Sequence, residues 1–398
     1  MTPASRSRWY GTFLMALSFV GLALAYAAGR LNLAHEMRGA LTLRIARWAS
    51  PIPPGPPEDA AASETWSQLD ALLDQRLHGQ AMHDSRWGEL LATSNPADQQ
   101  RIVGELRARF LGLLRPWPGP QVDLDPQRQA WFSTDEIEVS LIRLQVYPGL
   151  RILCALLEPR GRQTPRPALL VLHGFDGNLQ RVVADIDYHH GFGMDLARRG
   201  FVVLAPLRVT ASVEAQSRFQ IKSLAGGWTF EAVELWQLAR AVDFLVSLPQ
   251  VDRHHVGVYG ISFGGQHALR LGAIDERLSL VVCSGYFTKR LDWTFNRFPL
   301  TPSHHVNVLP DMGVLLDDVN LVALVQPRFF GVESGTADPR HDAAASAFAD
   351  VARLYQHAGY PDRARFMAFR GGHETSVATV APFLEQWLAT PFSREAPE

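Results

Sequence analysis

The sequence predicts an α/β protein built on a mostly parallel, doubly wound sheet. Short apolar runs alternate with helical stretches from about residue 165 to residue 390. Apolar runs of this length suit strands that are covered on both faces, and strands joined by helices run parallel. We expect strands at 167–173, 201–206, 255–261, 278–287, 327–334 and 363–369. Helices are expected before residue 199, at 229–247, from residue 262 onward, at 342–358 and at about 374–389.

Two further regions precede this alternation. EIEVSLIRLQV and RILCALLEP flank Pro148-Gly149 and predict a β-hairpin. Further upstream, Asn95-Pro96 has the pattern of a helix N-cap followed by proline at the first helical position. We therefore predict a helical extension over 61–125 and an α/β domain over 126–392. One apolar face of the extension needs a partner and should pack on the next domain: Ile102, Val103, Leu106, Phe110 and Leu113.

The first 30 residues predict a membrane anchor. Trp9–Gly29 holds 21 residues without a formal charge, about enough to cross a hydrocarbon layer of roughly 30 Å. A cleaved signal peptide is the main alternative, since Ala23-Leu24-Ala25 resembles a cleavage site, and a buried soluble helix is the third. An amphipathic stretch and a proline-rich spacer occupy 31–60. We expect the following domain to be extracytoplasmic (periplasmic), or secreted if the segment is cleaved.

Composition excludes several classes of protein. Hydrophobic residues make up 47% of the 398, which is typical of globular proteins rather than disordered ones. Lys and Arg number 38 against 40 Asp and Glu, for a net charge of −2, so no basic excess indicates nucleic-acid binding. The two cysteines, Cys154 and Cys283, lie in apolar strand-like runs, which predicts buried thiols.

A serine nucleophile is predicted by Gly260-Ile261-Ser262-Phe263-Gly264. A serine on a sharp turn from strand to helix needs small residues two positions away on either side. The apolar run VGVYGI before Ser262 and the helical pattern after it supply that context. The alternative is a glycine-rich turn that carries no chemistry.

A base and an acid should follow the serine in chain order. His373 lies in Arg370-Gly371-Gly372-His373-Glu374, between a predicted strand and a predicted helix, and is the expected base. Asp338 follows the strand PRFFGVES and is the expected acid. Glu333 and Asp342 are its competitors, and a helix-capping role for Asp338 is the alternative.

An oxyanion hole needs two backbone N–H donors. We predict the amide of Phe263, directly after the nucleophile, and the amide of Phe175 in the segment HGFDG after strand 167–173. The neighbouring His173 is expected to be a structural hydrogen-bonding residue.

Taken together, the segments HGFDG, YHHGFGMDLARRGFVVLAP, GISFGG, PRFFGVESGTADP and FRGGHE resemble the α/β-hydrolase superfamily. More narrowly, the chain is similar to bacterial esterases of the acetyl-xylan-esterase and dienelactone-hydrolase type. The resemblance covers about 165–390 and implies a triad of Ser262, Asp338 and His373 on an α/β-hydrolase fold. It implies an acyl-enzyme mechanism on a small-molecule or carbohydrate ester, such as an acetyl or short-acyl ester.

No cofactor and no metal are expected. The pairs His189-His190 and His304-His305 are poor metal sites, because adjacent histidines on a strand or helix point apart. Candidate substrate contacts are Tyr188, Tyr286 and Trp293, and the aromatic stretch 285–325 is read either as a lid insertion or as packing. A peptidase of the prolyl-oligopeptidase type and an inactive membrane-bound binding module are the alternative functions. Oligomeric state is left open.

Overall fold

A computed structural model describes the chain at 67–69, 71–73, 75, 82–115, 120–161, 165–175, 177–208, 213–289 and 309–391. Asp74–Glu398 forms one compact unit, to which every element below belongs. The predicted anchor, amphipathic stretch and spacer lie outside the described residues. Within the described ranges, no helix is long and apolar enough to cross a membrane.

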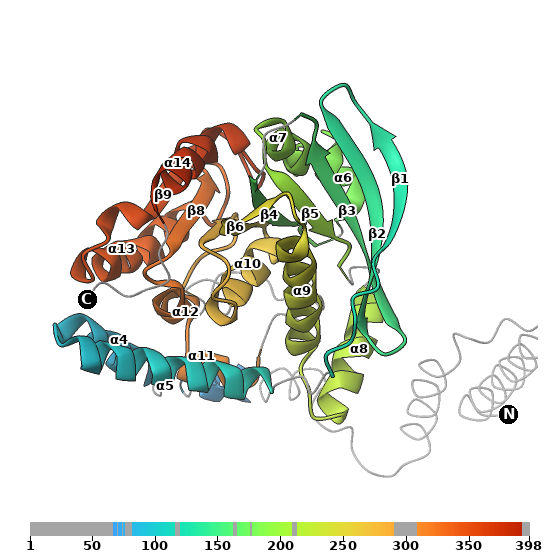
Figure 1. Ribbon diagram of the computed structural model, residues 1–398. Helices are drawn as coiled ribbons and strands as arrows, with labels where there is room; N and C mark the ends of the chain where they lie inside the picture. Colours follow the sequence, from blue (N-terminus) through green and yellow to red (C-terminus); the bar gives the residue numbers. More distant parts are fainter. Residues whose placement is uncertain are drawn as a thin grey trace, which may run out of the picture. The chain divides into compact units, whose positions relative to one another are not determined.

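A nine-stranded sheet organises the described part of the unit, in the order β1-β2-β3-β5-β4-β6-β7-β8-β9 (Figure 1). Strands β5, β4, β6, β7, β8 and β9 run parallel, while β1, β2 and β3 pair antiparallel and join the sheet through β5. The strands are β1 (Gln127–Ser133), β2 (Ile137–Tyr147), β3 (Leu150–Pro159), β4 (Arg166–Leu172), β5 (Val202–Pro206), β6 (Val251–Ile261), β7 (Leu280–Ser284), β8 (Phe329–Gly335) and β9 (Ala364–Phe369).

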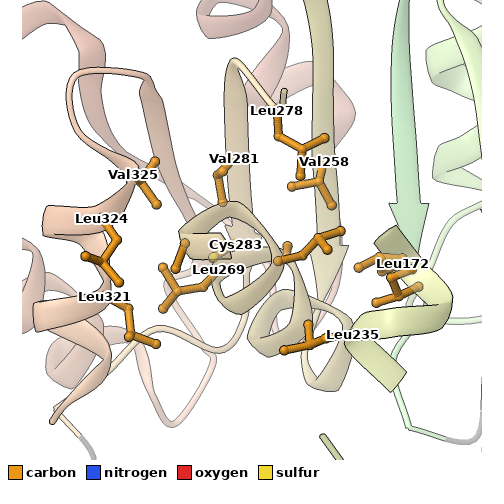
Figure 2. Close-up of a cluster of buried hydrophobic side chains, with 14 of the residues drawn as sticks. Leu172, Leu235, Val258, Leu269, Leu278, Val281, Cys283, Leu321, Leu324 and Val325 are labelled. Carbon is orange, nitrogen blue, oxygen red and sulfur yellow. The ribbon is translucent and has the colours of Figure 1, made fainter. Parts of the chain in front are cut away.

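Both faces of the parallel strands are covered. In β4, Leu170 and Leu172 belong to one hydrophobic cluster, whereas Leu169 and Val171 belong to another, as the two-residue period of a strand requires. Figure 2 shows part of the first cluster, where strand, α10 and α12 side chains meet around Cys283. Both cysteines are buried free thiols, which confirms that prediction.

The helices divide between the two faces (Figure 1). On one face lie α6 (Leu179–Val183), α7 (Phe192–Arg198) and α14 (Val377–Ala389). The other face carries α9 (Phe230–Ser247), α10 (Phe263–Ile274), α12 (Asp318–Val325) and α13 (His341–His357). The remaining helices are α4 (Met82–Ala92), α5 (Pro96–Leu114), α8 (Val213–Ala225), α11 (Met312–Leu315) and the 3₁₀ turn η4 (Pro361–Arg363).

Helix α5 shares the core of the sheet. Its N-cap is Asn95, whose side chain accepts a hydrogen bond from the Ala97 amide. Its apolar face lies in the same cluster as the strands and contacts α12. At its C-terminal end, the Leu114 carbonyl accepts a hydrogen bond from the Thr229 hydroxyl just before α9. The helix is therefore fastened to the sheet-bearing part of the chain at both its side and its end.

The Phe110→Ala substitution is expected to destabilise the unit by about 3–5 kcal/mol, because Phe110 is fully buried and its removal leaves a cavity. Leu111→Ala is the matched control, since Leu111 is 40% exposed and should cost little. Urea denaturation of both variants measures the difference. Equal, small changes would show that α5 does not contribute to the core.

The predicted lid region 285–325 is described only in part. Residues 290–308, which include Trp293, lie outside the described residues. Helix α12 occupies 318–325, and every one of its residues is buried. Residues 318–325 therefore belong to the core, and the lid insertion stays a prediction for the rest of the region.

Candidate active site

Ser262 occupies the sharp turn between β6 and α10. Its φ of 56° and ψ of −120° lie outside the regions that non-glycine residues favour, so the backbone is strained there. The Ser262 amide donates to the Ser284 carbonyl at 2.8 Å. A Cβ on Gly260 would lie 2.1 Å from the Gly264 carbonyl oxygen, so the strand and helix pass too closely for a side chain. This geometry is the physical reason for the glycines in the GxSxG pattern.

Gly264→Ala is expected to destabilise the protein by roughly 3 kcal/mol or more and to displace the nucleophile. The new Cβ would sit 2.1 Å from the Leu172 carbonyl oxygen and 2.7 Å from that of His173, and backbone atoms cannot move aside cheaply. Gly104→Ala is the control, because its helical position is open and alanine should slightly stabilise α5. Thermal melting of both variants checks the pair, and a Gly264→Ala protein as stable as wild type would contradict the close approach.

His373 and Asp338 are brought together by the loops that follow β9 and β8. The His373 Nδ1 lies 2.6 Å from the Asp338 Oδ2. Asp338 is buried, and its Oδ1 accepts a hydrogen bond from the Arg340 amide at 2.9 Å. Burial alone would raise the pKa of Asp338, but the hydrogen bonds from His373 and Arg340 lower it on balance. The carboxylate thus stays ionised and orients the imidazole.

Ser262 and His373 both lie against the backbone of Ser284 and Gly285. Ser284 accepts the Ser262 amide, and a Cβ on the adjacent Gly285 would lie 2.9 Å from the His373 Cε1. The imidazole therefore lies against the backbone that follows β7, one residue from the contact that holds the serine. With Nδ1 donating to Asp338, Nε2 is the nitrogen left to take a proton.

The two predicted oxyanion donors lie on neighbouring segments. Phe263 is the first residue of α10, where an amide has no acceptor within the helix. Phe175 follows β4, and its ring packs edge-to-face on the Phe263 ring at 5.8 Å between centroids. The peptide before the Phe175 amide is fixed through the Gly174 carbonyl, which faces the His173 Nδ1 at 2.9 Å and the Gly177 amide at 3.1 Å.

Beneath these segments lies a buried ionic network that the sequence did not reveal. The Arg208 side chain donates to the His173 carbonyl at 2.8 Å and to Glu234 at 2.9 Å, and its guanidinium lies 4.4 Å from the centre of the Phe263 ring. Burial alone would raise the pKa of Glu234, but Arg208 and His267 lower it to about 2. Through Arg208 the network contacts both the segment before Phe175 and the Phe263 ring, so it holds the segments of both predicted donors. No local sequence pattern indicates that Arg208, which lies just after β5, is buried.

Glu333, the first competitor for the role of acid, has other partners among the described residues. It is fully buried and accepts hydrogen bonds from the Tyr259 hydroxyl at 2.5 Å and the Ser376 amide at 2.7 Å. Burial raises the pKa of Glu333 to about 7, although hydrogen bonds from Tyr259, Ser284 and Ser376 oppose the shift. Asp342, the second competitor, is exposed in the first turn of α13.

The contribution of Glu333 to the free energy of unfolding is expected to fall as pH rises from about 4.5 to about 7. In this window folded Glu333 holds a proton that the unfolded chain releases, so raising the pH favours unfolding. One such group contributes a slope of at most about 1.4 kcal/mol per pH unit. Urea denaturation across this range isolates that contribution: the free energy of unfolding of wild type should decline relative to that of Glu333→Gln as pH rises, and should stay parallel to that of exposed Glu385→Gln. Parallel curves for all three would exclude a raised pKa.

The candidate substrate contacts have different surroundings. The Tyr188 hydroxyl donates to the Phe175 carbonyl at 3.0 Å, and the Tyr188 ring lies 5.9 Å from the His373 ring. Tyr286 follows β7, and its hydroxyl donates to Asp318 at 2.7 Å. The Tyr188 side chain thus lies beside His373, whereas the Tyr286 hydroxyl is bonded to helix α12.

Of the two histidine pairs considered as metal sites, the structure describes His189 and His190. His189 and His190 face different partners, the first buried and the second 43% exposed at its side chain. No cluster of three or more His, Cys, Asp or Glu able to hold a metal occurs among the described residues. His304 and His305 lie outside them.

The chain is similar to several proteins that are described as esterases. The family model described as acetyl xylan esterase (AXE1) matches residues 120–291. A putative acetyl xylan esterase from Bacteroides fragilis superposes with a TM-score of 0.60 at 16% identity, over 75% of this chain and 81% of that one. A glucuronoyl esterase from Solibacter usitatus gives 0.55 at 15% identity, over 75% and 96%. These structural likenesses establish the fold.

A curated relative from Pseudomonas aeruginosa is an uncharacterized protein, 29% identical over 190 residues. The match covers 47% of this chain and 44% of the relative's length. Topology and comparisons define the class of fold, which is the α/β-hydrolase fold. Within that class, its residues 120–291 are similar to the acetyl xylan esterases.

Proposed function

We propose that this protein hydrolyses carboxylic esters through a Ser262–His373–Asp338 triad. The contact of 2.6 Å between His373 and Asp338, beside a strained serine turn, is the observation that carries the proposal. The Ser262 Oγ attacks the ester carbonyl while the His373 Nε2 takes the hydroxyl proton. The amides of Phe263 and Phe175 stabilise the oxyanion of the tetrahedral intermediate.

Collapse of that intermediate breaks the ester C–O bond and leaves the acyl group on Ser262. The departing alkoxide takes the proton from His373 and leaves as the alcohol. A water molecule, deprotonated by His373, then attacks the acyl carbon. The bond between that carbon and the Ser262 Oγ breaks, the Oγ takes the proton from His373, and the carboxylic acid leaves. The residues need no cofactor or metal for these steps.

The proposed substrate is an acetyl or short-acyl ester of a carbohydrate or another small molecule. The similarity of residues 120–291 to acetyl xylan esterases supports this class. Tyr188, Tyr286 and Trp293 are the proposed substrate contacts. The Tyr188 ring beside His373 supports the first of them, since it lies where the bound ester must approach the base.

A fluorophosphonate probe tests the proposal directly. The probe should label the protein at Ser262, located by peptide mass spectrometry, and an ester panel of increasing acyl length should show fastest turnover for acetate. Failure to label Ser262 would indicate an inactive fold that serves as a binding module. Turnover of matched amides above that of esters, after correction for intrinsic reactivity, would indicate a peptidase.

We further propose that Trp9–Gly29 anchors the protein in a membrane, with the catalytic unit on the extracytoplasmic side. The support is the length of this uncharged segment. A reporter fused to the C-terminus, active only outside the cytoplasm, tests the orientation. Recovery of the protein in the soluble extracytoplasmic fraction without its N-terminus would instead indicate a cleaved signal peptide.

A further inference from the structure

The stretch Tyr188–His190 joins the two loops that the proposed mechanism uses. It lies between α6 and α7, while one loop follows β4 and carries Phe175 and the other follows β9 and carries His373. None of these three residues takes a step in the proposed reaction. Their hydrogen bonds nevertheless fasten both loops.

His189 holds the loop that follows β4. It is fully buried, and its Nε2 accepts a hydrogen bond from the Gly174 amide at 3.0 Å. Its Nδ1 therefore carries the ring proton and donates to the Asp187 Oδ1 at 2.8 Å. Asp187 is held in turn by an ion pair with Arg181 at 3.1 Å. Burial lowers the pKa of His189 despite its Asp187 partner, which keeps the imidazole neutral and its Nε2 able to accept.

Tyr188 holds the next residue of the same loop. Its hydroxyl donates to the Phe175 carbonyl, and its ring packs against the His189 ring at 4.0 Å between centroids, with the two planes tilted by 33°. Gly174 leaves the room for this contact, since a Cβ there would lie 2.4 Å from the Tyr188 hydroxyl oxygen. The Gly174 amide, the Gly174 carbonyl and the Phe175 carbonyl are thus all bonded. The Phe175 amide is left to bind an oxyanion.

The same stretch holds the loop of the base. The Thr375 amide donates to the Tyr188 carbonyl at 3.1 Å, and the Thr375 hydroxyl donates to the His189 carbonyl at 2.8 Å. The His190 Nε2 lies 2.8 Å from a Glu374 oxygen. Thr375 follows His373 by two residues, so the backbone at 188–190 fixes the loop of the imidazole as well.

We propose that His189, assisted by Tyr188, is a positioning residue that holds the oxyanion-binding loop in register with the loop that carries the base. It acts through the Gly174 amide and touches no reacting atom. Losing this contact lets the Phe175 donor shift, which weakens binding of the transition state more than binding of the substrate. The inference rests on the proposed esterase function and deepens it.

The test compares His189→Phe, which removes the acceptor but keeps a planar ring, with His189→Gln, whose side-chain oxygen can accept the Gly174 amide. For His189→Phe we expect kcat with p-nitrophenyl acetate to fall roughly 10- to 100-fold while KM changes less than about twofold. Inhibition by a trifluoromethyl ketone, which forms an oxyanion on the serine, should weaken by a similar factor. His189→Gln should recover most of the lost kcat.

His255→Phe is the matched control, because His255 also pairs with an aspartate and packs on an aromatic ring, at the far end of β6. It should leave kcat unchanged. Equal losses of kcat in His189→Phe and His255→Phe, or a loss in His189→Phe that His189→Gln does not restore, would overturn the proposal. An unchanged kcat in His189→Phe would overturn it as well.

Amide hydrogen exchange gives a readout that does not depend on turnover. The Gly174 amide should exchange faster in His189→Phe than in wild type and be protected again in His189→Gln. Unchanged protection would show that His189 does not hold the loop. If wild type hydrolyses no ester, the proposed function fails, and this measurement alone then decides whether His189 positions Gly174.

Discussion

Replacing Ser262 by alanine is expected to lower kcat for p-nitrophenyl acetate by roughly 10⁴- to 10⁶-fold, because the Ser262 Oγ is the atom that forms the acyl-enzyme. The double variant Ser262→Ala/His373→Ala should be no slower than Ser262→Ala alone. A base has no function once the hydroxyl that it deprotonates is gone. Such non-additivity is the signature of residues that act as one unit.

Steady-state kinetics of both variants, with melting temperatures as a check on folding, measures this effect. Ser284→Ala is a suitable control, since this buried serine lies next to the site and contributes a hydroxyl contact to the Glu374 carbonyl at 3.4 Å. It should cost far less than Ser262→Ala. Turnover that survives in Ser262→Ala would place the nucleophile elsewhere and remove the proposed triad.

Replacing Asp338 by asparagine is expected to lower kcat by roughly 10³- to 10⁴-fold with little change in KM. The asparagine amide can present an N–H to the His373 Nδ1, which favours the tautomer with the proton on Nε2. That tautomer cannot accept the serine proton. The imidazolium formed in the transition state also loses the carboxylate that stabilises it from 2.6 Å.

The pH profile of Asp338→Asn distinguishes this mechanism from a loss of stability. Activity should recover partly at high pH, where hydroxide or deprotonated groups can replace the base, while the melting temperature stays near that of wild type. Asp342→Asn is the control, because this exposed carboxylate lies four residues away on α13. If Asp342→Asn lost as much activity as Asp338→Asn, the assignment of the acid would be wrong.

Most of the fold was predictable from local sequence patterns. The strands around Val258 and Val282 are buried on both faces. Every position of such a strand must be apolar, so a short segment of sequence is enough to recognise it. The turn at Ser262 was predictable for the same reason. Gly260 and Gly264 are only four residues apart, and a side chain on Gly260 would clash with the Gly264 backbone. The Asn95 cap is equally local, with its bond to the Ala97 amide.

Partners far apart in the chain were not predictable in this way. Arg208 contacts residues 26 and 35 positions away, and nothing in LRVT indicates that a charge will be buried there. The hydrogen bond from the Tyr188 hydroxyl to the Phe175 carbonyl was not predictable either, because only the fold brings 175 and 188 together. Strand β1 was missed since every one of its residues is exposed, so its sequence lacks the alternation that identifies a half-buried strand.

The place of α5 has a practical consequence for where the chain can be shortened. A fragment that starts at residue 126, at the boundary that the sequence suggested, would leave an open hydrophobic furrow where Leu106 and Phe110 now lie. It would also strip the Thr229 hydroxyl of its carbonyl partner at the start of α9. Such a fragment is expected to aggregate, whereas one that begins ahead of α4 keeps its whole interior.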